Sequence, residues 1–312
     1  MASDPKIAAA ENATAARRRD ITQMTPAQAR AMRVDMVKAS ELPAEPIAAM
    51  RDIMVRGAQG EIPARVYTPE GSSLGDPRPI LLWFHGGGMV IGDNYVQSDR
   101  PARRIANRTH CIVLAVEYGL APEHPFPAGV QDCCASLRWA VEHGGEIGGD
   151  PSRLAVHGDS GGGLPAAVSA VMARDNGIAL AHQLLVYPNL DVTMREDTWR
   201  TNVSHGLNRA MMEWFIGHYL PPGTDPTDPM ASPVFTKDLR GLAPATIIAA
   251  EFDPLIGEEA TYTRRLMQAG VAVEMRTWKG MPHGFFVMTK LYPEALEATD
   301  YASTRLRAAF AR

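Results

Sequence analysis

The segment HGDSGGG, residues 157–163, places Ser160 between glycines in the pattern G-x-S-x-G. Between a strand and a helix, this pattern forms a strained turn that exposes the serine hydroxyl as a nucleophile. The core GDSGG is also typical of trypsin-like serine proteases, which are all-β proteins. That class places its histidine and aspartate before the serine. Here the candidates follow the serine, so the sequence favours the strand–turn–helix interpretation.

A serine nucleophile needs a general base, and the base needs a carboxylate to orient it. Of the nine histidines, His283 is the best placed, in the Gly- and Pro-containing segment KGMPHGFF after the last predicted strand. Asp253 follows the apolar run at 245–250, at the strand end where α/β sheets place active sites. Glu251 is the rival acid, and helix capping is the structural alternative for Asp253. The order Ser160, Asp253, His283 is that of the α/β-hydrolases.

A second glycine-rich segment, HGGGMVIG at 85–92, follows the apolar run ILLWF. Acyl transfer passes through a tetrahedral oxyanion, which preorganised hydrogen-bond donors must stabilise. Consecutive glycines let backbone N–H groups turn towards that oxygen, together with the N–H of the residue after the nucleophile, here Gly161. We expect His85 and Gly86 to support this loop. A plain glycine-rich turn is the alternative, and the serine turn downstream weighs against it.

Continuous apolar runs alternate with helical patterns along the chain. Such runs are typical of strands buried on both faces of a parallel sheet. The expected strands lie at 80–84, 111–116, 153–158, 183–187, 245–250 and 271–277. The expected helices include 128–143, 162–176 and 257–269. This alternation predicts an α/β fold with a mostly parallel central sheet flanked by helices.

Two regions fall outside this alternation. Residues 1–45 have a helical pattern before any predicted strand, and residues 189–235 insert an apolar helical segment and a Pro-rich stretch between strands. They predict a helical cap over a core made of residues 46–188 and 236–312. Apolar residues of the glycine-rich loop and of the insertion are candidates for the substrate pocket, although their spacing is also typical of a helix core. They are Met89, Val90, Met211, Met212, Trp214 and Phe215.

Composition and charge exclude several classes of protein. Of 312 residues, 46% are hydrophobic and 21% charged, and the formal net charge is −4. Nucleic-acid binding usually requires a basic surface, so we expect no nucleic-acid partner. Three cysteines cannot form a closed set of disulfides, which favours a reducing compartment. The sequence has no signal-peptide pattern and no apolar run of about 20 residues, so we expect a cytoplasmic protein without a membrane span. No metal or other cofactor is expected.

Taken together, the motifs resemble those of the hormone-sensitive-lipase-like family of microbial carboxylesterases, in the α/β-hydrolase superfamily. They are HGGG (85–88), YGLAPEHPFPAG (118–129), GDSGGG (158–163), EFDPL (251–255) and PHGF (282–285), in the family's order. The resemblance implies an α/β-hydrolase fold with a helical cap. It also implies a nucleophile, an acid and a base at Ser160, Asp253 and His283. The implied oxyanion donors are the N–H groups of Gly87, Gly88 and Gly161.

The chain departs from the family pattern at three places. Gly161 stands where the family usually has alanine, which leaves the main-chain donor in place. Gly119 replaces the arginine of Y-R-L-A-P-E and removes a side chain that bridges segments. The sequence DPLIGEE at 253–259 replaces D-P-L-x-D-E-G, which changes contacts at a helix start rather than the acid itself.

We expect a serine carboxylesterase that hydrolyses esters with short or medium acyl chains through an acyl-enzyme intermediate. An amidase or peptidase would use the same three residues, and this alternative stays open. A non-catalytic small-molecule receptor on the same fold is a third interpretation, but such receptors lose one of the three residues. The expected partner is a small ester. The oligomeric state stays open, a homodimer included.

Overall fold

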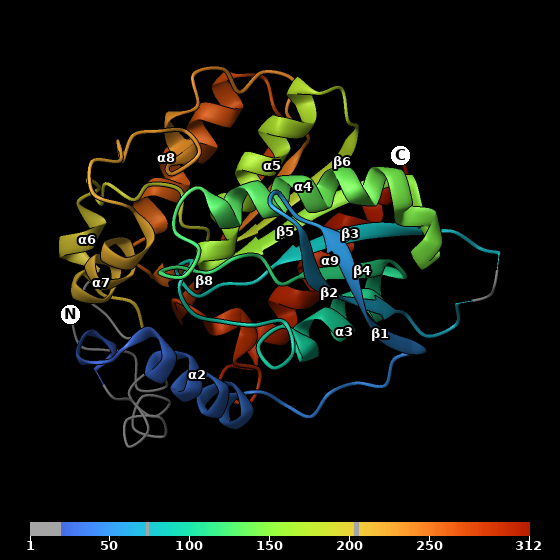
Figure 1. Ribbon diagram of the computed structural model, residues 1–312, viewed down its shortest axis with the longest axis horizontal. Coiled ribbons are helices and arrows are strands. Elements are labelled where there is room, and N and C mark those ends of the chain that lie inside the picture. Colours follow the sequence, from blue (N-terminus) through green and yellow to red (C-terminus); the bar gives the residue numbers. More distant parts are fainter. Residues whose placement is uncertain (1–19, 73–74, 203–205) are drawn as a thin grey trace.

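A mostly parallel sheet crosses the centre of the molecule (Figure 1). The computed structural model describes residues 20–72, 75–202 and 206–312. Within these ranges eight strands form one sheet, in the order β1-β2-β4-β3-β5-β6-β7-β8. The pairs β1–β2 and β2–β4 are antiparallel, and the other pairs are parallel. The strands are β1 (Ala49–Arg56), β2 (Glu61–Thr68), β3 (Arg78–Phe84), β4 (Ile112–Val116), β5 (Gly149–Asp159), β6 (Leu180–Val186), β7 (Ala245–Phe252) and β8 (Val273–Pro282).

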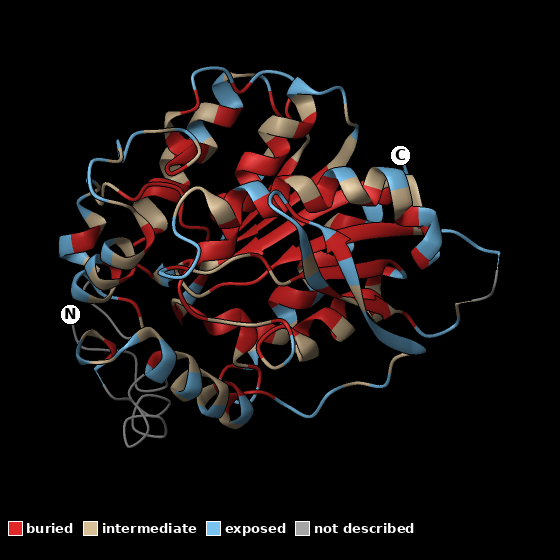
Figure 2. Ribbon diagram, in the orientation of Figure 1, coloured by how far each residue is buried: buried red, intermediate tan, exposed pale blue. Residues whose placement is uncertain are grey.

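Helices cover both faces of this sheet. One face carries α4 (Ala128–His143), α5 (Gly163–Asp175) and α8 (Ile256–Gln268), and the other carries α3 (Asp99–Thr109) and α9 (Glu294–Phe310). Short 3-10 helices are η2 (Gly144–Ile147), η3 (Ser160–Gly162) and η5 (Phe285–Val287). Each face of the sheet has its own hydrophobic core. Along β3, Leu82 packs into the core on the side of α4, α5 and α8, and Leu81 packs into the core on the side of α3 and α9. Because both faces are covered, the central strands are buried over most of their length, as Figure 2 shows.

These elements confirm the predicted fold class. All six predicted strands are present as β3 to β8, and the predicted helices are present as α4, α5 and α8. Sequence analysis did not identify β1, β2 or α3.

Segments from distant parts of the chain meet at one end of the molecule, on the left of Figure 1. From the N-terminal region come η1 (Ile21–Gln23) and α2 (Pro26–Ser40), and between β6 and β7 lie α6 (Thr198–Thr201), α7 (Arg209–Tyr219) and η4 (Pro233–Phe235). Thr25 and Gln28 form a capping box that starts α2. η1 contacts α7. Residues 1–19 and 203–205 of the predicted cap lie outside the described ranges.

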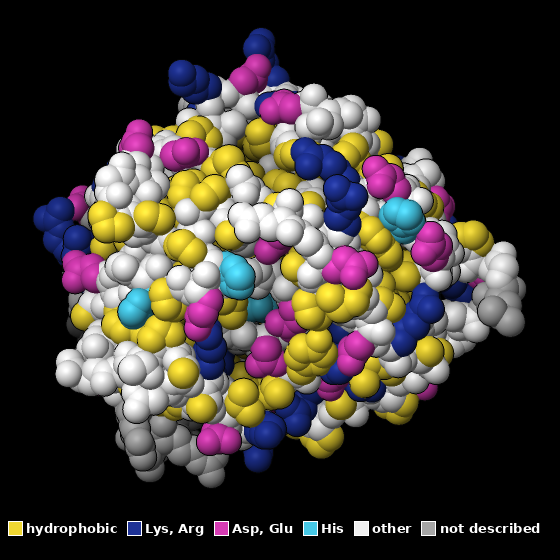
Figure 3. Space-filling model, in the orientation of Figure 1, with side chains coloured by type: hydrophobic (Ala, Val, Ile, Leu, Met, Phe, Trp, Pro, Cys, Tyr) yellow, Lys and Arg dark blue, Asp and Glu magenta, His cyan; other side chains and the backbone are white. Residues whose placement is uncertain are grey.

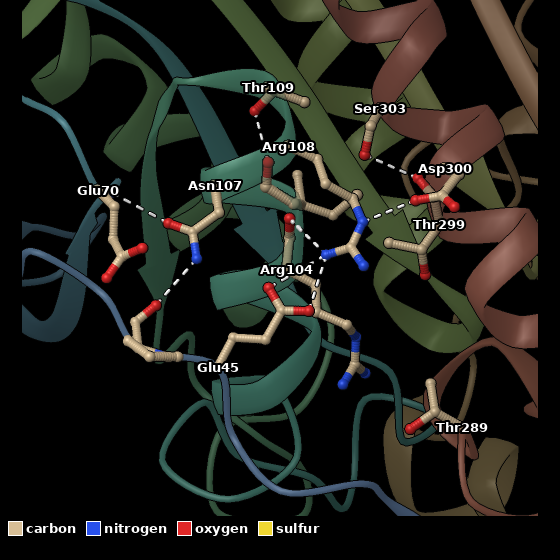
Figure 4. Close-up of polar contacts among 12 residues, drawn as sticks. Glu45, Glu70, Arg104, Asn107, Arg108, Thr109, Thr289, Thr299, Asp300 and Ser303 are labelled. Atoms are coloured by element: carbon tan, nitrogen blue, oxygen red, sulfur yellow. Dashed lines mark hydrogen bonds and ion pairs between the residues drawn. The ribbon is translucent and has the colours of Figure 1, made fainter.

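The segment that joins α2 to β1 is tied to the core by side chains of α3 (Figure 4). Arg108 donates to Glu45 at 3.0 Å and to Asp300 of α9 at 2.7 Å. Asn107 donates to the carbonyl oxygen of Pro46 at 2.9 Å. These contacts fix the path of the chain between α2 and the sheet.

A buried ion pair holds the C-terminal end of α2. Arg104 of α3 contacts Glu41 at 2.8 Å, and the two side chains are only 2% and 0% exposed. Thr289 donates a hydrogen bond to the same carboxylate at 2.6 Å. Burial raises the pKa of Glu41, and the charge of Arg104 opposes that rise. The pair therefore joins three segments that are far apart in the sequence.

The surface carries charges of both signs. Figure 3 shows acidic and basic side chains interspersed over the face in view. Among the described residues, no helix combines the length and the apolar character that crossing a bilayer requires.

Candidate active site

Ser160 lies where β5 ends and the chain turns through η3 into α5. Its φ is 53°, in the left-handed region that residues other than glycine rarely adopt. Such a conformation persists only where the surrounding structure enforces it, and it is common at functional sites. The local structure is therefore the sharp strand-to-helix turn that the G-x-S-x-G pattern predicts.

The structure brings the three predicted residues together. Ser160 Oγ lies 2.8 Å from His283 Nε2, and His283 Nδ1 lies 2.6 Å from Asp253 Oδ2. An ionised carboxylate only accepts hydrogen bonds, so Nδ1 carries the ring proton and Nε2 can accept from the serine hydroxyl. The other oxygen of Asp253 accepts from the N–H of Leu255 at 2.9 Å. The rival acid Glu251 is exposed and instead accepts from the N–H of Gly280 at 2.7 Å.

Asp253 and His283 occupy a largely closed environment. The Asp253 side chain is fully buried and that of His283 is 12% exposed. The ring of Tyr187 packs on that of His283, with 4.9 Å between centroids. The imidazole is thus held from one side by the carboxylate and from another by an aromatic ring.

The glycine-rich loop after β3 is fastened by hydrogen bonds to its backbone. Gly86 donates its N–H to Asp159 Oδ1 at 3.1 Å, and the hydroxyl of Tyr118 donates to the carbonyl oxygen of His85 at 2.5 Å. The rings of His85 and Tyr118 also stack, 4.5 Å apart. Asp159 is buried, which raises its pKa. Sequence analysis assigned no role to Asp159, and the structure shows it joining the serine turn to this loop.

The backbone around Gly88 packs directly against two other segments. Gly88 has φ 60°, and a Cβ there would lie 2.5 Å from the ring of Phe215 on α7. A Cβ on Gly161 would lie 2.5 Å from the nitrogen of Gly88. Three glycines expected as oxyanion donors, Gly87, Gly88 and Gly161, therefore lie on two backbone segments in close contact, next to Ser160.

A cavity of about 410 Å³ lies over Ser160 and His283. Of the predicted pocket residues, Met211, Met212 and Phe215 line it. Met89, Val90 and Trp214 are not among the described residues that line it. Trp214 instead packs on Phe215, with ring centroids 5.3 Å apart.

Sequence analysis did not single out several other residues of the cavity wall. They come from both segments that were predicted to form the cap and from the region after His283, and they are Ile21, Met32, Arg33, Met36, Leu207, Val287 and Met288. Apolar residues at helical spacing over 32–36 are the only sequence signal for this part of the wall, and such spacing also describes any helix core.

The segment DPLIGEE, residues 253–259, places two buried carboxyl groups, those of Glu258 and Glu259, in the first turn of α8. Glu258 accepts hydrogen bonds from the N–H groups of Leu190, at 2.6 Å, and Asp191, at 3.2 Å. Glu259 is fully buried and has no hydrogen-bond partner among the described residues. Burial raises the pKa of both glutamates, and the charge of Asp253 raises that of Glu259 further.

Comparisons with known proteins identify the family to which this fold belongs. A profile of the alpha/beta hydrolase fold matches residues 81–287. Carboxylesterase NlhH of Mycobacterium tuberculosis is 40% identical over 255 residues, which cover 80% of this chain and 79% of that protein. Carboxylic ester hydrolase LipN of the same species is 38% identical over 270 residues, covering 84% and 70%.

Solved structures show the same similarity. An alpha/beta hydrolase enzyme from the metagenome of Lake Arreo, Spain, superposes with a TM-score of 0.93 at 34% identity, with 99% of each chain covered. A thermostable esterase from Pseudomonas putida ECU1011 also has a TM-score of 0.93, at 30% identity and 99% coverage of each chain. The chain belongs to the hormone-sensitive-lipase-like family of α/β-hydrolases, and it is a carboxylic ester hydrolase.

Proposed function

We propose that the protein is a serine esterase in which Ser160 attacks the ester carbonyl, His283 transfers protons and Asp253 orients His283. The observation that carries this proposal is the hydrogen-bonded chain from Ser160 Oγ to His283, 2.8 Å, and from His283 to Asp253, 2.6 Å. Ser160 and His283 line the cavity. The names of the relatives support the same reaction.

In this mechanism Ser160 Oγ forms a bond to the carbonyl carbon while its proton passes to His283 Nε2. Asp253 stabilises the imidazolium that results. His283 then returns the proton to the leaving alkoxide, and an acyl-enzyme remains. A water molecule then attacks the acyl carbon while its proton passes to His283. The bond to Ser160 Oγ breaks, His283 returns the proton to that oxygen, and the carboxylic acid leaves.

The N–H groups of Gly87, Gly88 and Gly161 are the proposed donors to the tetrahedral oxyanion. This assignment is supported by the close contact, next to Ser160, between the two backbone segments that carry these glycines. His85 and Gly86 hold the loop in place, through the bonds to Tyr118 and Asp159.

Residues 1–45 and 189–235 form the proposed cap, over core parts 46–188 and 236–312. In support, α2 and α7 both contribute side chains to the cavity over Ser160. The cavity wall next to α7 is apolar, with Met211, Met212 and Phe215. We propose esters of short-to-medium acyl chains as substrates, because a cavity of about 410 Å³ accommodates a small ester.

Replacement of the nucleophile tests the mechanism. Ser160→Ala should fold normally and lose about 10⁴–10⁶-fold in kcat on p-nitrophenyl butyrate, because no other group replaces the serine hydroxyl. A fluorophosphonate should label the wild-type protein once, at Ser160, as mass spectrometry of peptides would show. Retained activity in the variant, or labelling elsewhere, would contradict the assignment. Parallel assays on butyryl p-nitroanilide distinguish an esterase from an amidase.

Acyl-chain preference tests the pocket. Each buried methylene contributes about 0.8 kcal/mol, or about fourfold in kcat/KM, until a wall is reached. Met211→Ala should move the optimum to longer chains while acetate turnover stays near the wild-type rate. Ile216→Ala, on the same helix but outside the described cavity lining, is the matched control. An unchanged profile in Met211→Ala would place the acyl chain elsewhere.

A further inference from the structure

The direction of an oxyanion donor depends on the carbonyl group that shares its peptide bond. The peptide between Gly86 and Gly87 carries the carbonyl oxygen of Gly86 and the N–H of Gly87. In a planar trans peptide these two groups point in opposite directions. A side chain that holds the Gly86 oxygen on one side therefore aims the N–H of Gly87 to the other side.

Gln97 holds that oxygen. Its side-chain Nε2 donates to the carbonyl oxygen of Gly86 at 3.2 Å, and the residue is only 2% exposed. His85 Nδ1 lies 2.8 Å from the same oxygen, so both lone pairs of the carbonyl are engaged. The N–H of Gly86 is bound to Asp159. The peptide on each side of Gly86 is therefore fixed.

Arg33, on the cap helix α2, fixes the amide of Gln97. Its Nε donates to Gln97 Oε1 at 3.1 Å. A guanidinium can only donate, so it selects the orientation in which the amide oxygen faces Arg33 and the NH₂ group faces Gly86. Arg33 also lines the cavity over Ser160. A continuous set of contacts thus runs from the cap helix to the glycine-rich loop.

We propose that Gln97 is a positioning residue for the oxyanion hole and that Arg33 acts through it, so that α2 helps to set the direction of the Gly87 N–H. This rests on the proposed role of Gly87 as an oxyanion donor. Loss of one such donor typically lowers kcat by about 10²–10³-fold. Because His85 still holds the Gly86 oxygen, we expect a smaller loss, about tenfold, when Gln97 is replaced.

Gln97→Glu separates positioning from packing. The carboxylate keeps the size of the side chain and forms an ion pair with Arg33, but it has no hydrogen to donate to Gly86. Its second carboxylate oxygen then faces the carbonyl oxygen of Gly86, which costs stability, while the ion pair with Arg33 offsets part of that cost. In the folded variant kcat on p-nitrophenyl butyrate should fall about tenfold, and KM should stay within about twofold. Gln97→Met should show a similar loss of kcat.

A transition-state analogue provides the readout that a packing defect would not move. A short alkyl trifluoromethyl ketone forms a tetrahedral adduct with the serine, so its inhibition constant depends on the oxyanion donors. In the Gln97 variants it should rise by the factor by which kcat/KM falls. Wild-type kcat and ketone affinity in Gln97→Glu would overturn the proposal, as would a loss confined to KM.

A double-mutant cycle tests the part played by Arg33. If Arg33 acts through Gln97, the double variant Arg33→Met, Gln97→Met should be no slower than Gln97→Met alone. Multiplicative losses would overturn the link between the two residues. Arg30→Met is the matched control, because Arg30 ties the same helix to the carbonyl of Val90, whose peptide carries no proposed donor. An equal loss in that variant would indicate general loosening of the cap instead.

Failure of this inference is distinct from failure of the proposed function. The function fails if the wild-type protein does not hydrolyse esters or if Ser160→Ala remains active. The inference fails if the wild type is active and the Gln97 variants match it.

Discussion

At the residue scale, the position after the nucleophile controls how closely two backbone segments approach. The family usually has alanine there, and this chain has Gly161. A Cβ at this position would lie 2.5 Å from the nitrogen of Gly88 and 2.8 Å from its Cα, which is closer than real Cβ atoms come. The glycine-rich loop therefore sits nearer to the serine turn than an alanine would permit.

Gly161→Ala should push Gly88 away from the turn and lengthen its hydrogen bond to the oxyanion. We expect kcat to fall about tenfold with little change in KM, since the donor acts mainly in the transition state. Steady-state kinetics on a short p-nitrophenyl ester measure this. Gly145→Ala is the control, because a Cβ there meets nothing within 4 Å. Equal activity in the two variants would mean that the loop moves without consequence.

The sequence was enough to predict that the side chains of Ser160, Asp253 and His283 lie together, because each residue follows a strand end and their order is typical of α/β-hydrolases. It gave no indication of Gln97 or Arg33. Their interaction joins residues 64 positions apart, and neither belongs to a motif. A polar side chain that binds a carbonyl group of a distant segment produces no recognisable pattern in the sequence around it.

At the element scale, the elements that sequence analysis missed lack the usual apolar pattern. β1 is exposed at most positions, so its alternation carries no hydrophobic signal. β2 contains Pro63, which is unusual within a strand. The sequence of α3 is DRPARRIANRT. Its arginines make the helix look polar on every side, although one face, which includes Arg104, is buried. The burial of Arg104 cannot be predicted from the sequence of α3, because it depends on an ion pair with Glu41, which lies on another segment.

The start of α8 buries an acidic side chain. Burial, and then the charge of Asp253, raise the pKa of Glu259 well above its ordinary range. In the unfolded chain the same group ionises at ordinary pH. As the pH rises from the ordinary glutamate pKa towards the raised one, the unfolded state loses the proton first, so folding stability falls.

Glu259→Gln should therefore gain stability relative to the wild type as the pH rises. The difference in the free energy of unfolding should grow by up to about 1.4 kcal/mol per pH unit across that window. Urea titrations at several pH values between 5 and 8 measure it. Glu142→Gln, at an exposed position on α4, is the control. A constant difference between Glu259→Gln and the wild type would show that Glu259 is ionised in the fold.

At the scale of the whole molecule, the site combines residues from both ends of the chain. Arg33 lies on α2, near the start of the described chain, and His283 lies near the C-terminal helix α9. The buried contacts of Glu41 with Arg104 and Thr289 join the end of α2 to α3 and to the segment after η5. This cluster connects α2, which belongs to the proposed cap, to the same part of the chain that carries His283.

Arg104→Met should destabilise the protein by about 3 kcal/mol, because it leaves a buried carboxylate without its partner. Adding Glu41→Gln should restore part of that loss, since no unpaired charge then remains. Urea unfolding of the two variants measures both effects. Arg240→Met, which removes an exposed pair with Asp238, should have little effect. If the double variant is less stable than Arg104→Met, the cost arises from packing rather than charge.

The order of the strands in the sheet also has a consequence in time. The serine turn follows β5, whereas His283 lies 123 residues later, after β8 at the edge of the sheet. Ser160 is therefore synthesised long before His283, the base proposed for it. Until β8 has joined β7, the contact between Ser160 Oγ and His283 Nε2 cannot form, and under the proposed mechanism a fluorophosphonate should leave nascent chains that end before β8 unlabelled. The proposed activity then arises no earlier than the pairing of the last strand with the sheet.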